Sequence, residues 1–127
     1  MLRRTFLSTL GVALADVLPG QQKPRFSANP FTLGVASGDP SADGFVLWTR
    51  LLHKDLIEPV PVRWVVASDD RCTKILKQGT AVASGDLGHS VHVEVNGLAP
   101  DRPYWYRFDV GGEESPVGRT RTAPAAG

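Results

Sequence analysis

Hydrophobic and polar residues alternate most regularly in two segments in the second half of the chain. In residues 90–96 the hydrophobic positions are Val91, Val93 and Val95, and the residues between them are polar. Residues 104–110 repeat the pattern, with an inward set that consists of Tyr104, Tyr106, Phe108 and Val110. A repeat of two residues is that of a β-strand with one buried face. Both segments are therefore predicted to be strands.

Shorter hydrophobic segments extend the pattern to about seven predicted strands, the number found in a small antiparallel sandwich. The further segments are residues 31–35, 45–51, 62–66, 75–83 and 117–122. We expect a turn at residues 37–40, a loop at residues 52–61, and a looser strand pair in residues 75–83 with its break at Gln78 and Gly79. Short strands between frequent turns, without an amphipathic helix, predict an all-β, immunoglobulin-like antiparallel β-sandwich.

Residues 97–104 favour the fibronectin type III-like branch of these sandwiches. This Gly- and Pro-containing turn carries the chain from one predicted strand to the next and places Tyr104 directly after the corner. In a tyrosine corner, the hydroxyl of such a residue bonds to the backbone a few residues upstream. The alternative is that Tyr104 is only the first core aromatic of its strand. The single cysteine, Cys72, excludes an internal disulfide and with it a disulfide-pinned immunoglobulin domain.

The first thirty residues are predicted to lie outside the sandwich. Arg3 and Arg4 precede Phe6 and Leu7, and the mildly apolar run that follows is shorter than the roughly 20 residues of a membrane span. An export signal typically has a charged start, a short apolar middle and a small-residue triplet, which here ends at Ala15. The paired arginines are typical of the twin-arginine (Tat) class of export signals. The alternative is an exposed amphipathic first helix of a cytosolic protein. Export predicts a periplasmic or extracellular location, with membrane contact only in transit.

Neither the net charge nor the potentially reactive residues indicate a catalytic site. The 127 residues carry a formal net charge of +1, which does not favour nucleic acid as a partner. His53, His89 and His92 lack the convergent partners that a metal or catalytic site needs, and His89 and His92 are expected to point to opposite faces of a strand. Cys72 follows a polar turn and is either a solvated thiol or a small residue at the start of a strand. No catalytic, cofactor-binding or metal residue is predicted.

One stretch is more specific than a β-sandwich requires. Residues 31–40 read FTLGVASGDP, and residues 44–51 read GFVLWTRL. These segments resemble the opening of the alkaline phosphatase D family, the PhoD-like phosphatases also labelled phospholipase D in older naming. The resemblance covers essentially everything after residue 30, and the family tends to carry a twin-arginine leader as well. The residues that carry the motif are Gly34, Ser37, Gly38, Asp39, Pro40, Trp48, Thr49 and Arg50.

The resemblance implies a noncatalytic role for this chain. In that family the matching part is an N-terminal immunoglobulin- or fibronectin-like module, and a larger domain behind it binds calcium and iron and performs catalysis. The positions that bear those metal ligands are expected beyond Gly127, and Cys72 is not equivalent to the metal-binding cysteine of the family. The expected organisation is a signal in residues 1–15, a linker in 16–30, the sandwich in 31–124, and the start of a linker to the catalytic domain in 125–127.

Two functional hypotheses follow. The chain is either the N-terminal module of an exported phosphatase or phosphodiesterase, which packs on its catalytic domain, or a stand-alone secreted β-sandwich used for binding. The outward residues Trp105 and Arg107 suit contact with a catalytic domain in the first case and with a ligand in the second. The simpler interpretation of Trp105 is a half-covered residue of the sheet.

Overall fold

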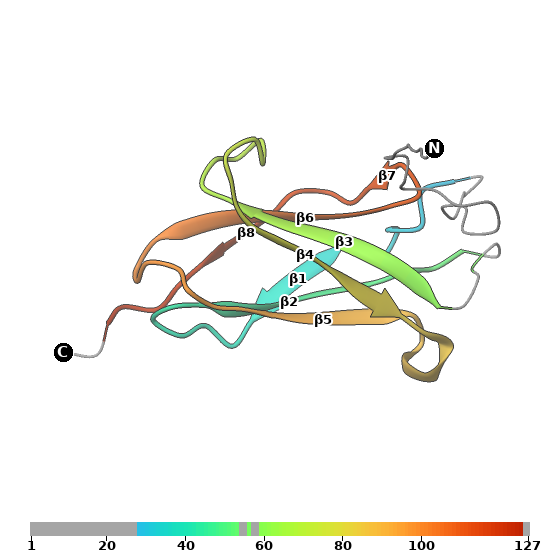
Figure 1. Ribbon diagram of the computed structural model, residues 1–127, viewed down its shortest axis with the longest axis horizontal. Helices are drawn as coiled ribbons and strands as arrows, with labels where there is room; N and C mark the ends of the chain where they lie inside the picture. The colour runs from blue at the N-terminus through green and yellow to red at the C-terminus, as the bar shows by residue number, and fades with distance from the viewer. Residues whose placement is uncertain (1–27, 54–55, 57–58, 126–127) are drawn as a thin grey trace, which may run out of the picture.

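The computed structural model describes residues 28–53, 56 and 59–125, which form two antiparallel sheets packed face to face (Figure 1). One sheet has the order β1 (Val35–Gly38), β2 (Phe45–Arg50) and β5 (Ser90–Val95). The other has the order β4 (Ile75–Ala83), β3 (Val60–Ala67) and β6 (Pro103–Val110), and β6 also pairs with β7 (Glu113–Glu114) and β8 (Gly118–Arg121). The predicted all-β sandwich is confirmed.

Helical structure is scarce in the described part of the chain, where the only helix is the short 3₁₀ turn η2 (Gly85–Leu87). No helix long and apolar enough to cross a membrane occurs among these residues. The predicted export signal, with Arg3, Arg4, Phe6 and Leu7, lies outside the described residues.

The hydrophobic core lies between the two sheets and follows the alternation in the sequence. Val91, Val93 and Val95 of β5 are buried on one side. The inward set of β6 faces them from the other sheet, and all four of its side chains are buried: Tyr104, Tyr106, Phe108 and Val110. Aromatic contacts join the layers, because the ring centroids of Phe45 and Tyr104 lie 6.0 Å apart. The strands that alternate most clearly in sequence therefore supply both walls of the core.

The first strand begins later than predicted. Residues 31–34 form a turn, in which the Gly34 N–H donates to the Phe31 carbonyl at 3.1 Å and Gly34 has a φ of +79°. The Asn29 side chain accepts a hydrogen bond from the Phe31 N–H at 2.8 Å, which stabilises the turn. Strand β1 starts at Val35 and includes Ser37 and Gly38, which the sequence had placed in a turn. The prediction of a strand over residues 31–35 was wrong because these local bonds satisfy the backbone first.

Strand β4 is continuous where the sequence predicted a break. Gly79 pairs with Trp64 of β3, and a Cβ at Gly79 would lie 2.8 Å from the Trp64 ring. Gly79 therefore leaves room for the Trp64 indole and does not interrupt the strand. The predicted loop over residues 52–61 also ends early, because Val60 and Pro61 belong to β3. At Pro61 strand β3 pairs only with β4, since pairing with β6 starts at Arg63, and a strand with one partner tolerates proline.

The two ends of the sandwich are built from different segments (Figure 1). The end on the right of Figure 1, which we call the entry end, holds residues 28–34 before β1, residues 51–53 after β2, the β4–β5 connection at residues 84–89, and residues 111–117, which include β7. At the opposite end, the exit end, the connections are residues 39–44, 68–74 and 96–102, and the chain leaves β8 through residues 122–125. The exit end therefore holds the chain where any following segment begins.

Candidate functional site

The motif loop at residues 39–44 is the first candidate. Asp39 has a φ of +52°, and the loop closes through the Ser41 N–H, which donates to the Gly44 carbonyl at 2.9 Å. The Ser41 hydroxyl donates to the Asp43 carboxylate at 3.0 Å. Gly44 approaches β5 so closely that a Cβ there would lie 1.8 Å from the Val95 carbonyl oxygen. Only glycine fits at this position, which fixes where β2 begins.

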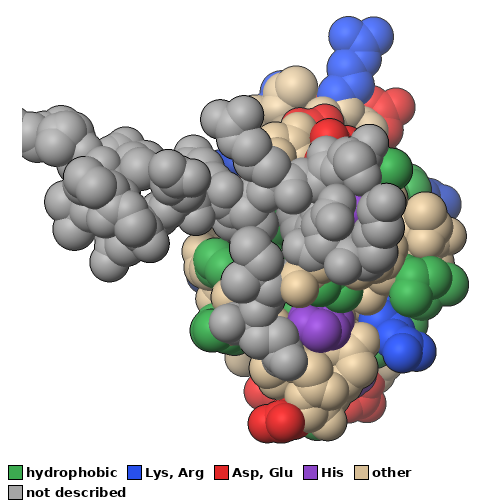
Figure 2. All heavy atoms as spheres, turned by 90° about the vertical axis from the view of Figure 1, so that its right-hand side faces the viewer, with side chains coloured by type: hydrophobic (Ala, Val, Ile, Leu, Met, Phe, Trp, Pro, Cys, Tyr) green, Lys and Arg blue, Asp and Glu red, His purple; other side chains and the backbone are tan. Residues whose placement is uncertain are grey.

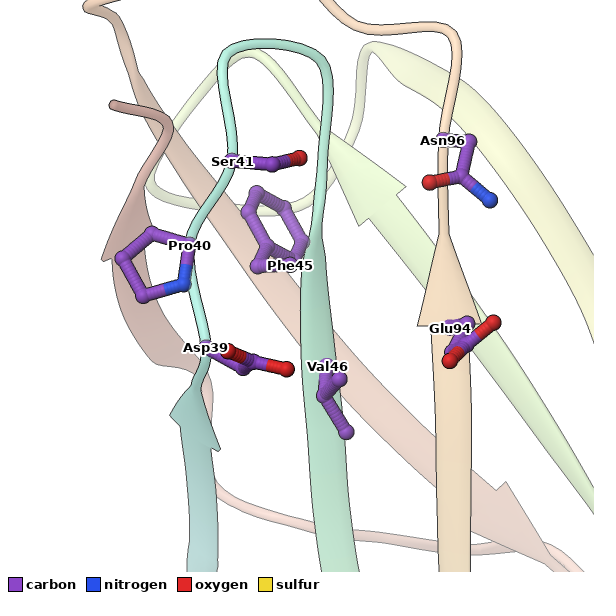
Figure 3. A pocket seen from close by; sticks show the side chains of 7 residues that line it. All are labelled: Asp39, Pro40, Ser41, Phe45, Val46, Glu94 and Asn96. Atoms are coloured by element: carbon purple, nitrogen blue, oxygen red, sulfur yellow. The ribbon is translucent and has the colours of Figure 1, made fainter. Parts of the chain in front are cut away.

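A polar hollow of about 210 Å³ opens beside this loop (Figure 3). Asp39 lies on one side of Val46 and Glu94 of β5 on the other, while Ser41 and Asn96 lie nearer the end of the sandwich. Carboxylates and an amide are oxygen ligands, but no three His, Cys, Asp or Glu side chains in the described part of the chain come together to hold a metal ion. The residues present therefore do not fit the calcium–iron centre that the resemblance places elsewhere in the family.

The remaining motif residues hold loops in place. Thr49 is fully buried, and its hydroxyl donates to the Gly34 carbonyl at 2.9 Å. The Arg50 Nε donates to the Gly88 carbonyl at 2.8 Å, and the Trp48 ring lies 6.4 Å from the His92 ring. The bonds of Thr49 and Arg50 join β2 to the two entry-end segments that contain Gly34 and Gly88.

Ser37 faces the sandwich interior from β1. A hydrogen bond links its side chain to the hydroxyl of Tyr106. Burial raises the pKa of Tyr106, and the bond with Ser37 opposes part of that rise. The serine thus connects the two sheets and is not placed beside a histidine base.

Tyr104 has the geometry of a tyrosine corner. Its ring is buried, and its hydroxyl accepts a hydrogen bond from the Ala99 N–H at 2.9 Å and lies 3.4 Å from the Ala99 carbonyl oxygen. The bond runs from strand β6 back to the turn five residues upstream. It holds residues 96–102 against the exit end of the sandwich.

The same turn holds the departing chain. The buried Thr122 hydroxyl donates to the Ala99 carbonyl at 2.7 Å and accepts from the Arg102 N–H at 3.1 Å. The Ala123 N–H donates to the Ser41 carbonyl at 2.8 Å. We call these five residues, Ser41, Ala99, Arg102, Thr122 and Ala123, the exit clamp. No local sequence pattern predicts the clamp, because its members lie in three separate segments.

The histidines do not converge. His92 is exposed on the outer face of β5, and His53 follows β2 in the entry-end connection. His89 has a φ of +59° in the turn before β5, where its carbonyl accepts from the Leu51 N–H at 3.0 Å. Among the described residues, none of the histidines belongs to a group of three or more His, Cys, Asp or Glu side chains that could hold a metal ion.

Cys72 lies in a second hydrophobic cluster on the outer face of the larger sheet. It is only 4% exposed and packs with Val65, Ala67 and Trp105. Burial raises the pKa of its thiol, and the positive charge of Arg107 opposes the rise. The alternative of a solvated thiol is therefore wrong. The thiol is protonated at neutral pH and is a poor nucleophile.

The side chains of Trp105 and Arg107 make contacts within the module. The Trp105 ring covers the second cluster, and the Arg119 guanidinium lies 5.9 Å from the ring centroid. Arg107 pairs with Glu114 at 3.7 Å. The interpretation of Trp105 as a half-covered residue of the sheet fits this packing better than a free ligand-binding surface.

Comparison with known proteins agrees with this geometry. The sequence model of the family "PhoD-like phosphatase, N-terminal domain" matches residues 9–124. The chain belongs to the PhoD-like phosphatase family. Alkaline phosphatase D of Bacillus subtilis (strain 168) is 54% identical over 110 residues, which are 82% of this chain and 19% of that protein. A solved structure titled "Structure of PhoD" superposes with a TM-score of 0.78 at 53% identity, over 82% of this chain and 21% of that one.

More distant structures share the fold alone. The sixth fibronectin type III domain of human fibronectin type III domain containing protein 3 is 17% identical, with a TM-score of 0.54 over 74% of this chain and 85% of that one. The sensor domain of the anti-sigma factor RsgI4 of Pseudobacteroides cellulosolvens is 9% identical, with a TM-score of 0.59 over 72% and 93%. The chain thus has a fibronectin-like fold and spans about a fifth of the length of its PhoD relatives.

Proposed function

We propose that this chain is the noncatalytic N-terminal module of an exported PhoD-like alkaline phosphatase or phosphodiesterase, and that it packs on the catalytic domain. The observation that carries the proposal is the short span of a strong match, 54% identity over only 19% of alkaline phosphatase D. The arrangement of the motif residues supports it, because Ser37, Thr49 and Arg50 form structural bonds. Hydrolysis of a phosphate ester would need a nucleophile that a base or a metal ion activates.

The proposal is tested by activity. The purified 127-residue chain, supplied with calcium and iron, is expected not to hydrolyse a chromogenic phosphate ester, whereas the longer protein that contains it does. The control is the same assay with a chelator. Chelator-sensitive turnover that stays with the purified 127-residue chain would overturn the noncatalytic role.

Reading the coding sequence downstream of Gly127 distinguishes the alternative. An open frame that continues to metal-ligand motifs supports the module. A stop codon there favours a stand-alone secreted fibronectin-like domain used for binding.

Export belongs to the same proposal and rests on Arg3, Arg4, Phe6 and Leu7. The twin-arginine route reads the arginine pair and not charge alone. Changing both Arg3→Lys and Arg4→Lys keeps the charge, and is expected to leave a fused reporter in the cytoplasm. Undiminished export of the double variant would show that this route is not used.

A further inference from the structure

The exit end carries a hollow whose lining is more apolar than polar and includes two residues of the exit clamp. It has a volume of about 340 Å³ and is lined by Leu76, Ala99, Arg102, Pro103 and Trp105, among others. Its lining comes from the β3–β4 and β5–β6 connections and from the adjoining parts of β4 and β6. Both connections lie on the left in Figure 1. Leu76 stands at its edge with half of its side chain exposed. A leucine beside an apolar hollow is a typical contact for another protein surface.

A β-bulge places Leu76 at this edge. Val66 of β3 pairs with Lys77 of β4, but the next residue, Ala67, pairs with Ile75, so Leu76 is the extra residue between them. A bulge bends the strand and redirects the side chain of the residue it inserts. Because β4 is an edge strand with β3 as its partner, this redirection leaves Leu76 at the border of the sheet.

The path of the chain indicates what covers the hollow. The exit clamp holds the backbone up to Ala123 at the same end, only two residues beyond the end of β8. In the PhoD relatives about four-fifths of the protein lies outside the matched part, which the family description names as N-terminal. A domain attached just beyond a rigid exit is held at high effective concentration beside it, so a small apolar contact is enough to dock it.

The entry end carries a smaller hollow of about 210 Å³, lined by Pro61, Val110 and Gly111, among others. The exposed leucines of this end are Leu33, Leu52 and Leu87. Figure 2 looks onto this end, and around the grey atoms it shows hydrophobic side chains next to charged and polar ones. The chain also enters the sandwich here, which puts this end on the side away from the exit clamp.

We propose that the exit-end hollow, with Leu76 at its edge, is the surface on which the catalytic domain of the full-length protein docks. This inference rests on the proposed function, because it takes the following domain to be the phosphatase domain. Docking there orients the module through two neighbouring contacts, the clamped chain and the hollow.

Hydrogen exchange of the full-length protein, compared with that of the 127-residue chain, tests the proposal. Amides of residues 75–77, 104 and 105 are expected to exchange at least about tenfold more slowly in the full-length protein, because the docked contact must open before they exchange. Amides around Val82 and Leu87 are expected to exchange equally in both.

Two variants of the full-length protein sharpen the test. Leu76→Asp places a charge in the contact and is expected to abolish the extra protection. Val82→Asp is the matched control, since Val82 lies on the same strand, is 59% exposed, and belongs to the entry end. It is expected to leave the protection unchanged. Because both residues are at least half exposed, either substitution, made in the 127-residue chain, is expected to leave its melting temperature within a few degrees of that of the unmodified 127-residue chain.

The outcomes separate the two proposals. Active full-length phosphatase with new protection around Leu33, Leu52 or Leu87 instead would overturn this surface and leave the proposed function standing. Protection that appears in the 127-residue chain alone and rises with its concentration would mean that a second copy covers the hollow, which also overturns it. An inactive full-length protein, or a frame that stops after Gly127, would overturn both.

Discussion

The exit end and the entry end of the sandwich are closed in different ways. At the exit end, hydroxyls of the buried residues Tyr104 and Thr122 bond to backbone groups of the adjoining turn. At the entry end, the buried Thr49 makes a single such bond, to the Gly34 carbonyl, the exposed Arg50 supplies another link, and several leucines remain in water. Buried bonds leave unpaired groups when they are broken, whereas exposed groups regain water. The exit end, from which the chain leaves, is therefore held in its conformation more tightly than the entry end.

The largest expected effect is at Gly44. Gly44→Ala drives a Cβ into the Val95 carbonyl, so β2 and β5 must separate at the exit end. We expect a loss of about 3 kcal/mol or more in the free energy of unfolding. Denaturant unfolding of the purified chain measures it.

Gly38→Ala is the control for this substitution. A Cβ at Gly38 meets no described atom within 4 Å. A change of less than about 0.5 kcal/mol is expected there. Equal losses at the two glycines would contradict the close approach of Gly44 to β5.

Thr122 and Thr49 compare the two ends directly, because each is buried and each hydroxyl donates to a backbone carbonyl. Thr122→Val keeps the shape, removes the acceptor of the Arg102 N–H and leaves the Ala99 carbonyl only the longer bond from the Tyr104 hydroxyl, at a cost of about 2 kcal/mol. Thr49→Val removes one bond at the entry end and is expected to cost about 1 kcal/mol. Chemical denaturation of both variants ranks them. A larger loss at Thr49 would reverse the comparison.

Tyr104→Phe removes the hydroxyl of the corner and keeps the buried ring. The Ala99 N–H loses its acceptor, so a loss of about 1.5 kcal/mol is expected. Tyr106→Phe is the paired variant, and its partner Ser37 is a partly exposed side chain that can turn to water. It should cost less. If thermal or denaturant melts show the opposite order, the corner does not hold the exit end.

The smallest effect is expected at the entry end. Leu87 is 66% exposed in η2, so Leu87→Gln is expected to change the free energy of unfolding by less than about 0.5 kcal/mol. Calorimetry of the variant checks this. A loss above about 1 kcal/mol would show that the entry end depends on its apolar side chains after all.

The strands that could be predicted are those whose pattern is local. The alternation in residues 90–96 and 104–110 reproduces β5 and β6 because burial on one face repeats every two residues. The turn at residues 31–34 was missed, because an Asn29 side chain outside the hydrophobic segment competes for the backbone. Gly79 was mistaken for a breaker because its reason, the Trp64 ring, lies on another strand.

The site was less predictable than the fold. Tyr104 stands out because a turn and an aromatic residue are adjacent in sequence, whereas its partner Ala99 carries no side-chain signal. Thr122 and Leu76 carry no motif at all, and their roles arise from a clamp and a bulge that depend on pairing between distant segments. Gly34, Asp39 and Trp48 belong to the motif by which the family is identified from the sequence. Their structural roles can be seen only from the residues that contact them. The export signal stays a prediction.

The burial of Cys72 gives this chain a built-in chemical reporter. It is the only cysteine of the sequence and lies in the connection at residues 68–74, where Val65, Ala67 and Trp105 pack around it. Trp105 also lines the exit-end hollow. A thiol reagent modifies Cys72 only while that connection is open, so the labelling rate measures the opening equilibrium. The readout needs no engineered probe. A neighbouring domain that settles on the hollow would register as slower labelling, so one natural atom, the Cys72 Sγ, can follow assembly in real time.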